Sequence, residues 1–319
     1  MRISSSAAGT VQSFVRLQPR FALIENFLSE FMSTKRVLAV HDLCSFGRCS
    51  LTAAIPVISA LGSQVCPFPT AWFSNNLTYG DFHFTDFTPQ MTGFMDQWEK
   101  LGFHYDALYS GFLADASQVS VVLEAIRRFG GSDALIVVDP VMGDDGAMYP
   151  IFTPAFVDEM RRLVGKATLI TPNYTEACLL LGRPLAKPTE DAIPDASDLK
   201  GMCRELSELG AGQVVITSVP AAEGLIKVVD YDARTGLYEE RLTERIALTT
   251  CGTGDLFTSV MTAALLRGFD LSQATRLAME FTSFVIDYTH RSGSDVREGV
   301  QIEPCLGRLI EMAAAQPAA

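Results

Sequence analysis

Near its centre the chain carries the run Ala134-Leu135-Ile136-Val137-Val138-Asp139-Pro140. Its apolar part shows no alternation with polar residues, which is typical of a strand buried on both faces of a parallel sheet. Similar short runs occur at 37–40, 107–109, 168–170 and 214–216, and a stretch with helical periodicity lies at 115–129. This alternation predicts an α/β fold with three layers, α/β/α, around a mostly parallel central sheet.

The last third of the chain departs from this alternation. Residues 225–231 and 237–242 are two strand-like runs separated by the turn signal Thr235-Gly236. They predict an antiparallel hairpin late in the sheet. Because no internal repeat or low-complexity linker is present, we expect residues 35–319 to form a single domain. Residues 1–34 contain three arginines and no acidic residue before Glu25. A disordered N-terminal extension is expected there, with a transit peptide and an over-extended start before Met32 as the alternatives.

Composition excludes several classes of partner. The formal net charge of −12 argues against binding to a nucleic acid or an anionic membrane surface. No apolar run approaches the ~20 residues that a transmembrane helix needs. The seven cysteines are scattered and form no CxxC pair, which indicates a reduced, cytoplasmic protein without a disulfide framework or structural zinc.

Polar residues follow three of the predicted strands. Asp139 ends one strand, Thr171-Pro172-Asn173 ends the next, and Thr217-Ser218 ends a third. In open α/β sheets, ligands bind beyond the carboxyl ends of the strands. These residues therefore predict one common binding edge.

The run Cys251-Gly252-Thr253-Gly254-Asp255 precedes the apolar helical stretch 256–266. Two glycines let backbone N–H groups converge at a helix N-terminus, an arrangement that suits the oxygens of a phosphoryl group in transfer. Asp255 is then placed to act as a general base, although a helix cap is the simpler alternative. The chain has no Walker lysine motif and no third glycine of a dinucleotide fingerprint, so a P-loop kinase and a Rossmann oxidoreductase fit poorly.

Two further segments carry acidic residues near this edge. Asn173-Tyr174-Thr175-Glu176 fits a helix capping box, and Glu176 is also a candidate for holding Mg²⁺ through water. The loop at 139–146 contains Asp144 and follows a strand directly, so it is either a ligand loop or a solvated turn.

The segment 73–80 mixes aromatic and small polar residues, as a site for a flat heteroaromatic ring does, although a turn with core aromatics is the alternative. Asp42 and Arg48 follow the first strand and are expected to face the site, with a structural ion pair as the alternative. The four histidines show no ligand spacing, so we assign them no metal.

Taken together, these motifs resemble the pyridoxal kinase branch of the ribokinase-like superfamily. The resemblance covers residues 36–290 and is carried by the segments 73–75, 139–144, 170–176, 214–218 and 252–257 in that order. It implies a homodimer that phosphorylates pyridoxal, pyridoxine or pyridoxamine with Mg²⁺ and ATP, in salvage to pyridoxal phosphate.

The resemblance also implies roles for individual residues. Asp255 would deprotonate the hydroxymethyl group, while the amides of Gly252, Thr253 and Gly254 would hold the γ-phosphate. Asp144 and Glu176 would act on metal and phosphate. The remaining expected contacts are Asp139, Thr171, Asn173, Thr217 and Ser218 with ATP or a monovalent cation such as K⁺, and Asp42, Phe73, Thr78, Tyr79 and Phe112 with the substrate.

Two departures from the family pattern concern the substrate. Asp42 stands where many pyridoxal kinases have a serine, and Asn75-Asn76-Leu77-Thr78 replaces the commoner Asn-His-Thr order. A hydroxymethylpyrimidine kinase of thiamine salvage is the main alternative, but it typically carries cysteine at the position of Asp255. A sugar kinase and a non-catalytic vitamer-binding protein are further alternatives.

Overall fold

In the computed structural model, the described residues are 34–185, 193–222 and 224–315. The predicted disordered extension at 1–34 therefore lies outside them, apart from Thr34. From Lys35 onward the chain forms one compact unit. None of the helices in the described ranges combines the length and the apolar character needed to cross a membrane.

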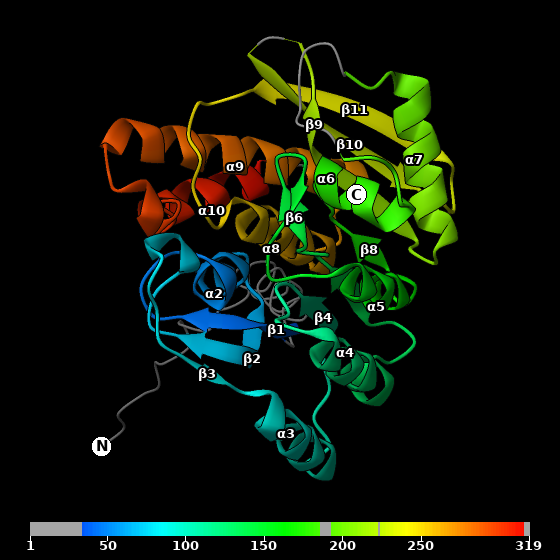
Figure 1. The fold of residues 1–319 in the computed structure, drawn as a ribbon, viewed down its shortest axis with the longest axis vertical. Helices are drawn as coiled ribbons and strands as arrows, with labels where there is room; N and C mark the ends of the chain where they lie inside the picture. The colour runs from blue at the N-terminus through cyan, green and yellow to red at the C-terminus, as the bar shows by residue number, and fades with distance from the viewer. Residues whose placement is uncertain (1–33, 186–192, 223, 316–319) are drawn as a thin grey trace, which may run out of the picture. The chain divides into compact units, whose positions relative to one another are not determined.

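A nine-stranded sheet forms the centre of this unit, in the order β11-β10-β9-β8-β5-β4-β1-β2-β3 (Figure 1). The six strands from β9 to β2 in this order are parallel, whereas β3, β10 and β11 pair antiparallel with their neighbours. The fold class and the late hairpin are thus confirmed. The strands are β1 (Arg36–Cys44), β2 (Gln64–Phe73), β3 (Phe84–Asp86), β4 (Ala107–Ser110), β5 (Leu135–Val138), β8 (Leu169–Ile170), β9 (Gln213–Pro220), β10 (Leu225–Asp232) and β11 (Leu237–Glu244), with a separate hairpin of β6 (Gly143–Asp144) and β7 (Ala147–Met148).

Helices cover both faces of the sheet because the strands present apolar side chains on both sides. In β1, Val37 packs on one face, while Leu38 and Val40 pack on the other. The first face is covered by α2 (Ser50–Ala60), α8 (Thr253–Leu266), α9 (Leu271–Ser292) and α10 (Leu306–Ala314). The second is covered by α3 (Thr88–Lys100), α4 (Ala116–Phe129), α5 (Pro154–Val164), α6 (Tyr174–Leu181) and α7 (Ala196–Glu208).

Strand β2 is the main element that the sequence did not predict. Pro67 and Pro69 lie within it, and proline is unfavourable in a central strand because it donates no ladder hydrogen bond. The edge strand β3 pairs only with residues 71–73 of β2. The two prolines therefore lie where one side of β2 has no partner strand among the described residues, so the missing N–H groups cost little.

Candidate functional site

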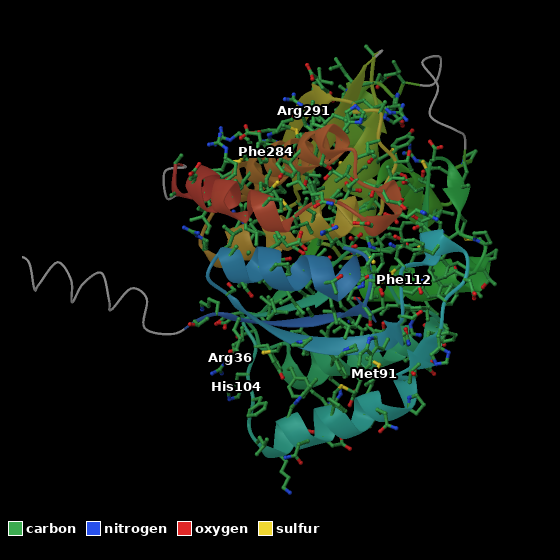
Figure 2. The ribbon with its side chains drawn as sticks, turned by 90° about the vertical axis from the view of Figure 1, so that its left-hand side faces the viewer. Arg36, Met91, His104, Phe112, Phe284 and Arg291 are labelled. Atoms are coloured by element: carbon green, nitrogen blue, oxygen red, sulfur yellow. The ribbon has the colours of Figure 1, made fainter. Side chains whose placement is uncertain are left out.

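The candidate site lies at the carboxyl ends of the parallel strands, where β1 and β4 are neighbours. Strand order reverses here, since β1 pairs with β2 on one side and β4 on the other, which makes this position the switch point where such sheets bind ligands. Figure 2 shows Phe112, just after β4, at this end of the sheet, with Arg36 and His104 at the opposite end.

The N-terminus of α8 forms an uncapped nest of backbone amides. Gly252 precedes the helix with φ = 88°, a left-handed conformation that glycine adopts without strain. Within the described residues, no side-chain hydrogen bond caps this end of α8. The first-turn amides, at Thr253 and Gly254, are therefore available to an anion, and the helix dipole favours negative charge there.

Asp255 lies in the first turn of α8 and points into the site, not into the apolar core. One carboxylate oxygen accepts the backbone N–H of Ser50 at 2.7 Å, and the other lies 2.8 Å from His41 Nε2. Its side chain is 13% exposed. Burial alone would raise the pKa of Asp255, but attraction to His41 and the two hydrogen bonds lower it below its ordinary value.

His41 is a site residue that our sequence interpretation missed. It lies in β1 beside Asp42, which contacts its other ring nitrogen, Nδ1, at 3.2 Å. Burial lowers the pKa of His41, yet the charge and hydrogen bonds of Asp255 and Asp42 raise it to about 10. A histidine–aspartate pair in a strand that ends at the binding edge was the available signal.

Asp139 and Thr171 come together at the ends of β5 and β8. The Thr171 and Thr258 hydroxyls lie 2.8 Å apart, and Thr258 donates to Asp139 at 3.3 Å. Asp139 is 5% exposed. Burial and repulsion from Asp255 raise the pKa of Asp139 to about 7, while His41 and Thr258 act in the opposite direction. Asp139 lies next to the nest, because a Cβ built on Gly254 would be 3.7 Å from its carboxylate. The nest therefore has a buried acid beside it whose side chain accepts one long hydrogen bond.

The sequence predicted for Glu176 either a helix capping box or a role in holding Mg²⁺. The structure contains the capping box. Asn173 accepts the Glu176 N–H, and Glu176 accepts the Asn173 N–H at 2.8 Å. The second oxygen of Glu176 accepts the Met142 N–H at 3.1 Å. Burial and repulsion from Asp139 raise the pKa of Glu176.

The hairpin β6–β7 carries Asp144 beside this cap. The Asn173 side chain donates to the Gly143 carbonyl at 2.8 Å, which ties the hairpin to α6. Asp144 itself is exposed. No cluster of three or more histidine, cysteine or acidic residues suited to a metal occurs in the described ranges. A hydrated cation that takes one or two carboxylates needs no such cluster.

Thr217 and Ser218 do not end a strand as expected, because β9 continues to Pro220. The register of the antiparallel pairing between β9 and β10 shifts at this point, between Lys227 and Val229 of β10. Ser218 has φ = 54°, which is consistent with a bulge in the strand. Because β9 continues past this bulge, the polar residues Thr217 and Ser218 do not mark its end. Thr217 still reaches the binding edge, where its N–H bonds to the Pro172 carbonyl at 3.0 Å.

The two phenylalanines predicted to contact the substrate lie on either side of β1. Phe73 ends β2 and stacks on Phe84 at 5.4 Å between ring centroids. Phe112 follows β4 and lies 5.9 Å from Phe152. Phe73 is 7% exposed, so much of its surface is already used in packing.

Thr78 and Tyr79 lie in a short 3-10 helix, η1 (Leu77–Tyr79). The Thr78 N–H bonds to the Asn76 side chain at 2.9 Å, and the Arg297 guanidinium lies 4.7 Å from the Tyr79 ring centroid. The buried Asn76 also contacts Cys251 Sγ at 3.4 Å. This segment is therefore attached to the residue that precedes the nest.

Arg48 does not face the site in the way expected for it. Its guanidinium pairs with Glu303 at 2.7 Å and with Glu298 at 3.7 Å. These are partly exposed contacts to the C-terminal region, so the structural ion pair is the correct alternative. The Arg48 carbonyl, in contrast, lies directly against Gly252.

Comparison with known proteins is consistent with this geometry. The sequence profile of the Phosphomethylpyrimidine kinase family matches residues 49–299. A Bacteroides thetaiotaomicron protein described as a phosphomethylpyrimidine kinase, solved with pyridoxal, is 39% identical, with a TM-score of 0.82 over 87% of this chain and 96% of that one.

Two further relatives are pyridoxal kinases. The structure of pyridoxal kinase from Lactobacillus plantarum is 28% identical, with a TM-score of 0.79 over 88% of this chain and 98% of that one. A pyridoxal kinase from Deinococcus radiodurans is 29% identical over 273 residues, which are 82% of this chain and 89% of the relative.

Proposed function

We propose that this chain, a kinase that belongs to the phosphomethylpyrimidine kinase family and has the ribokinase-like fold, transfers the γ-phosphate of ATP to the hydroxymethyl group of a pyridoxal vitamer. The observation that carries the proposal is the Asp255 carboxylate beside the uncapped amides at the start of α8. Similarity to a protein solved with pyridoxal and to pyridoxal kinases supports the choice of substrate class.

In this proposal Asp255 is the general base. Each of its oxygens already accepts one hydrogen bond, from Ser50 or from His41, and keeps a second lone pair for the substrate hydroxyl. As the hydroxyl oxygen attacks the γ-phosphorus, its proton passes to Asp255, and the bond between the γ-phosphorus and the bridging oxygen breaks so that ADP leaves. The amides of Gly252, Thr253 and Gly254 would meet the charge on the phosphoryl oxygens, because no side chain in the described residues caps this end of α8.

The described residues also suit the ions that the proposal needs. Mg²⁺ would be held by the exposed Asp144 and, through water, by Glu176, and it would supply charge neutralisation at the ATP phosphates. A monovalent cation such as K⁺ would fit beside Asp139, Thr171 and Thr217, because Asp139 is a buried carboxylate with a single long hydrogen bond from Thr258.

The test of this function is an ADP-release assay with Mg²⁺ and ATP across pyridoxal, pyridoxine, pyridoxamine and hydroxymethylpyrimidine. We expect turnover on at least one pyridoxal vitamer. Turnover on the pyrimidine alone would establish the thiamine-salvage alternative, to which the family profile also points. Binding of a vitamer without any ADP release would indicate a non-catalytic binding protein.

We further propose that the kinase acts as a cytosolic homodimer. The edge strand β3 and the end of β2 expose Trp72 at 51% and Phe84 at 50%, next to Phe82. Among the described residues β3 is the last strand of the sheet, and exposed aromatics at such an edge are unfavourable unless another chain covers them. Light scattering should give the dimer mass for the wild type and a lower mass for the double variant Trp72→Ser/Phe84→Ser, whereas a wild-type monomer would refute the proposal.

A further inference from the structure

His41 lies between two carboxylates in the interior of the site. Its Nε2 is 2.8 Å from Asp255 and its Nδ1 is 3.2 Å from Asp42, while only 1% of the residue is exposed. A neutral imidazole carries one N–H, so it would leave one of the two carboxylates against a bare lone pair. The doubly protonated ring donates to both.

The backbone after β4 covers the face of the same ring. A Cβ on Gly111 would lie 2.0 Å from His41 Nε2, so only glycine allows this approach. The Phe112 N–H lies 3.1 Å from Nδ1 and 3.4 Å from Nε2. These nearly equal distances place the amide over the ring, not along one in-plane lone pair, so both nitrogens remain free to carry protons.

The charge of His41 has a direct consequence for Asp255. A buried carboxyl group favours its neutral form, which cannot accept a proton from a substrate. The other charged or titratable groups around the ring are Asp42 on β1, Asp139 after β5 and Tyr109 on β4. The charge of His41 lowers the pKa of Asp139. The ring of Tyr109 meets the His41 ring edge-on, with 6.0 Å between the two centroids. The groups that lower the pKa of Asp255 are His41 and the Ser50 amide, and no arginine or lysine is among them.

We propose that His41 is a positioning residue that keeps the Asp255 carboxylate ionised and oriented toward the substrate hydroxyl, and that Asp42 holds His41 in this orientation. The inference rests on the proposed function, because it concerns the same base. It also gives Asp42 a role that differs from the direct ring contact implied by the family resemblance.

The first experiment compares the pH dependence of kcat for the wild type and His41→Gln, with the best vitamer as substrate. Glutamine retains a donor for Asp255 but removes the positive charge. We expect the acid limb of the variant to move upward by about 1–3 pH units, with activity regained at alkaline pH. A variant profile with unchanged midpoints, whatever its height, would overturn the positioning role.

The second experiment needs no activity and serves if His41→Gln does not fold. The ¹⁵N resonances of the histidine rings are followed by NMR from pH 6 to 9 in the wild type and in Asp255→Asn. One ring should remain doubly protonated through pH 8 in the wild type and titrate within this range in the variant. Identical titration of all rings in the two proteins would refute the inference.

These outcomes separate the two proposals. A persistently protonated ring in a protein that phosphorylates no vitamer would overturn the proposed function. Vitamer turnover by a protein whose histidines titrate alike in the wild type and Asp255→Asn would overturn the role of His41 and leave the function standing.

Discussion

Gly252 lies so close to Arg48 that a Cβ on the glycine would come within 2.0 Å of the arginine carbonyl oxygen. This contact joins the start of α8 to the residues just before α2. It sets the position of the amide nest relative to Ser50 and His41, which both contact Asp255.

Gly252→Ala should therefore be far more harmful than Gly254→Ala. Alanine at 252 would meet backbone at a positive φ, whereas at 254 the nearest atom to the new Cβ is the Asp139 carboxylate at 3.7 Å. We expect kcat/KM to fall on the order of 10²-fold for Gly252→Ala, with a lower Tm. Gly254→Ala should keep the wild-type Tm, and equal losses of Tm in both variants would contradict this account.

Asp255→Asn should lower kcat by roughly 10²–10⁴-fold, the usual contribution of a general base. Asparagine has the same shape and still accepts the Ser50 N–H, so the Kd of ATP should change little. Steady-state kinetics and calorimetric titration with ATP measure the two effects. Asp287→Asn on α9, an exposed ion-pair partner of Arg291, is the matched control and should behave as wild type. Near-normal turnover by Asp255→Asn would remove the proposed mechanism.

The pair of His41 and Asp255 should make stability depend on pH. The pKa of His41 is raised from 6.5 to about 10, so its stabilisation is complete below pH 6.5 and is lost as the pH rises toward 10. The pKa of Asp255 is lowered, so its contribution persists above its ordinary range and is lost only in acid. Tm should thus fall by a few degrees, on the order of 2–4 °C per kcal/mol lost, between pH 6.5 and 10. His41→Gln should show a flatter curve, and parallel curves would contradict the prediction.

Substitutions at Glu176 and Asp144 should separate the contribution of the helix cap to stability from the contribution of the carboxylates to Mg²⁺ binding. Glu176→Gln places an amide donor against one of two backbone N–H groups, which should cost about 1–3 kcal/mol. Asp144→Asn removes an exposed carboxylate without disturbing the cap. We therefore expect a lower Tm for the glutamine variant alone and a higher Mg²⁺ requirement for both, measured by thermal melts and Mg²⁺ titration of activity. An Mg²⁺ requirement unchanged in Asp144→Asn would refute its proposed role.

Much of the fold could be predicted because buried parallel strands leave a direct trace in the sequence. The runs at 37–40 and 134–138 have no polar alternation, and both became strands covered on two sides. Strand β2 left no such trace, because Pro67 and Pro69 are unfavourable in a ladder unless one side of the strand lacks a partner. That condition depends on how far β3 extends along β2. It cannot be inferred from the residues that surround the two prolines in the sequence.

The residues of the candidate site likewise fall into two groups, those that a local motif predicts and those that only the tertiary structure brings together. Asp255 and the glycines around it are neighbours in sequence, so their convergence could be inferred from one motif. The interactions of His41, Ser50 and Arg48 join segments more than 200 residues apart, and no local pattern indicates which partner each will take. The sequence allowed Arg48 either an ion pair or a place at the site, and only the tertiary structure decides between them.

The separation of 214 residues between His41 and Asp255 also bears on how the enzyme acquires its activity. Closing a loop of this length costs on the order of 5 kcal/mol in chain entropy, and contacts so distant in sequence form slowly. Local helices and the neighbouring strands β4 and β5 can assemble before the two residues meet. During refolding from denaturant, catalytic competence should accordingly appear later than helical circular dichroism, because the base is completed by one of the most distant contacts in the chain.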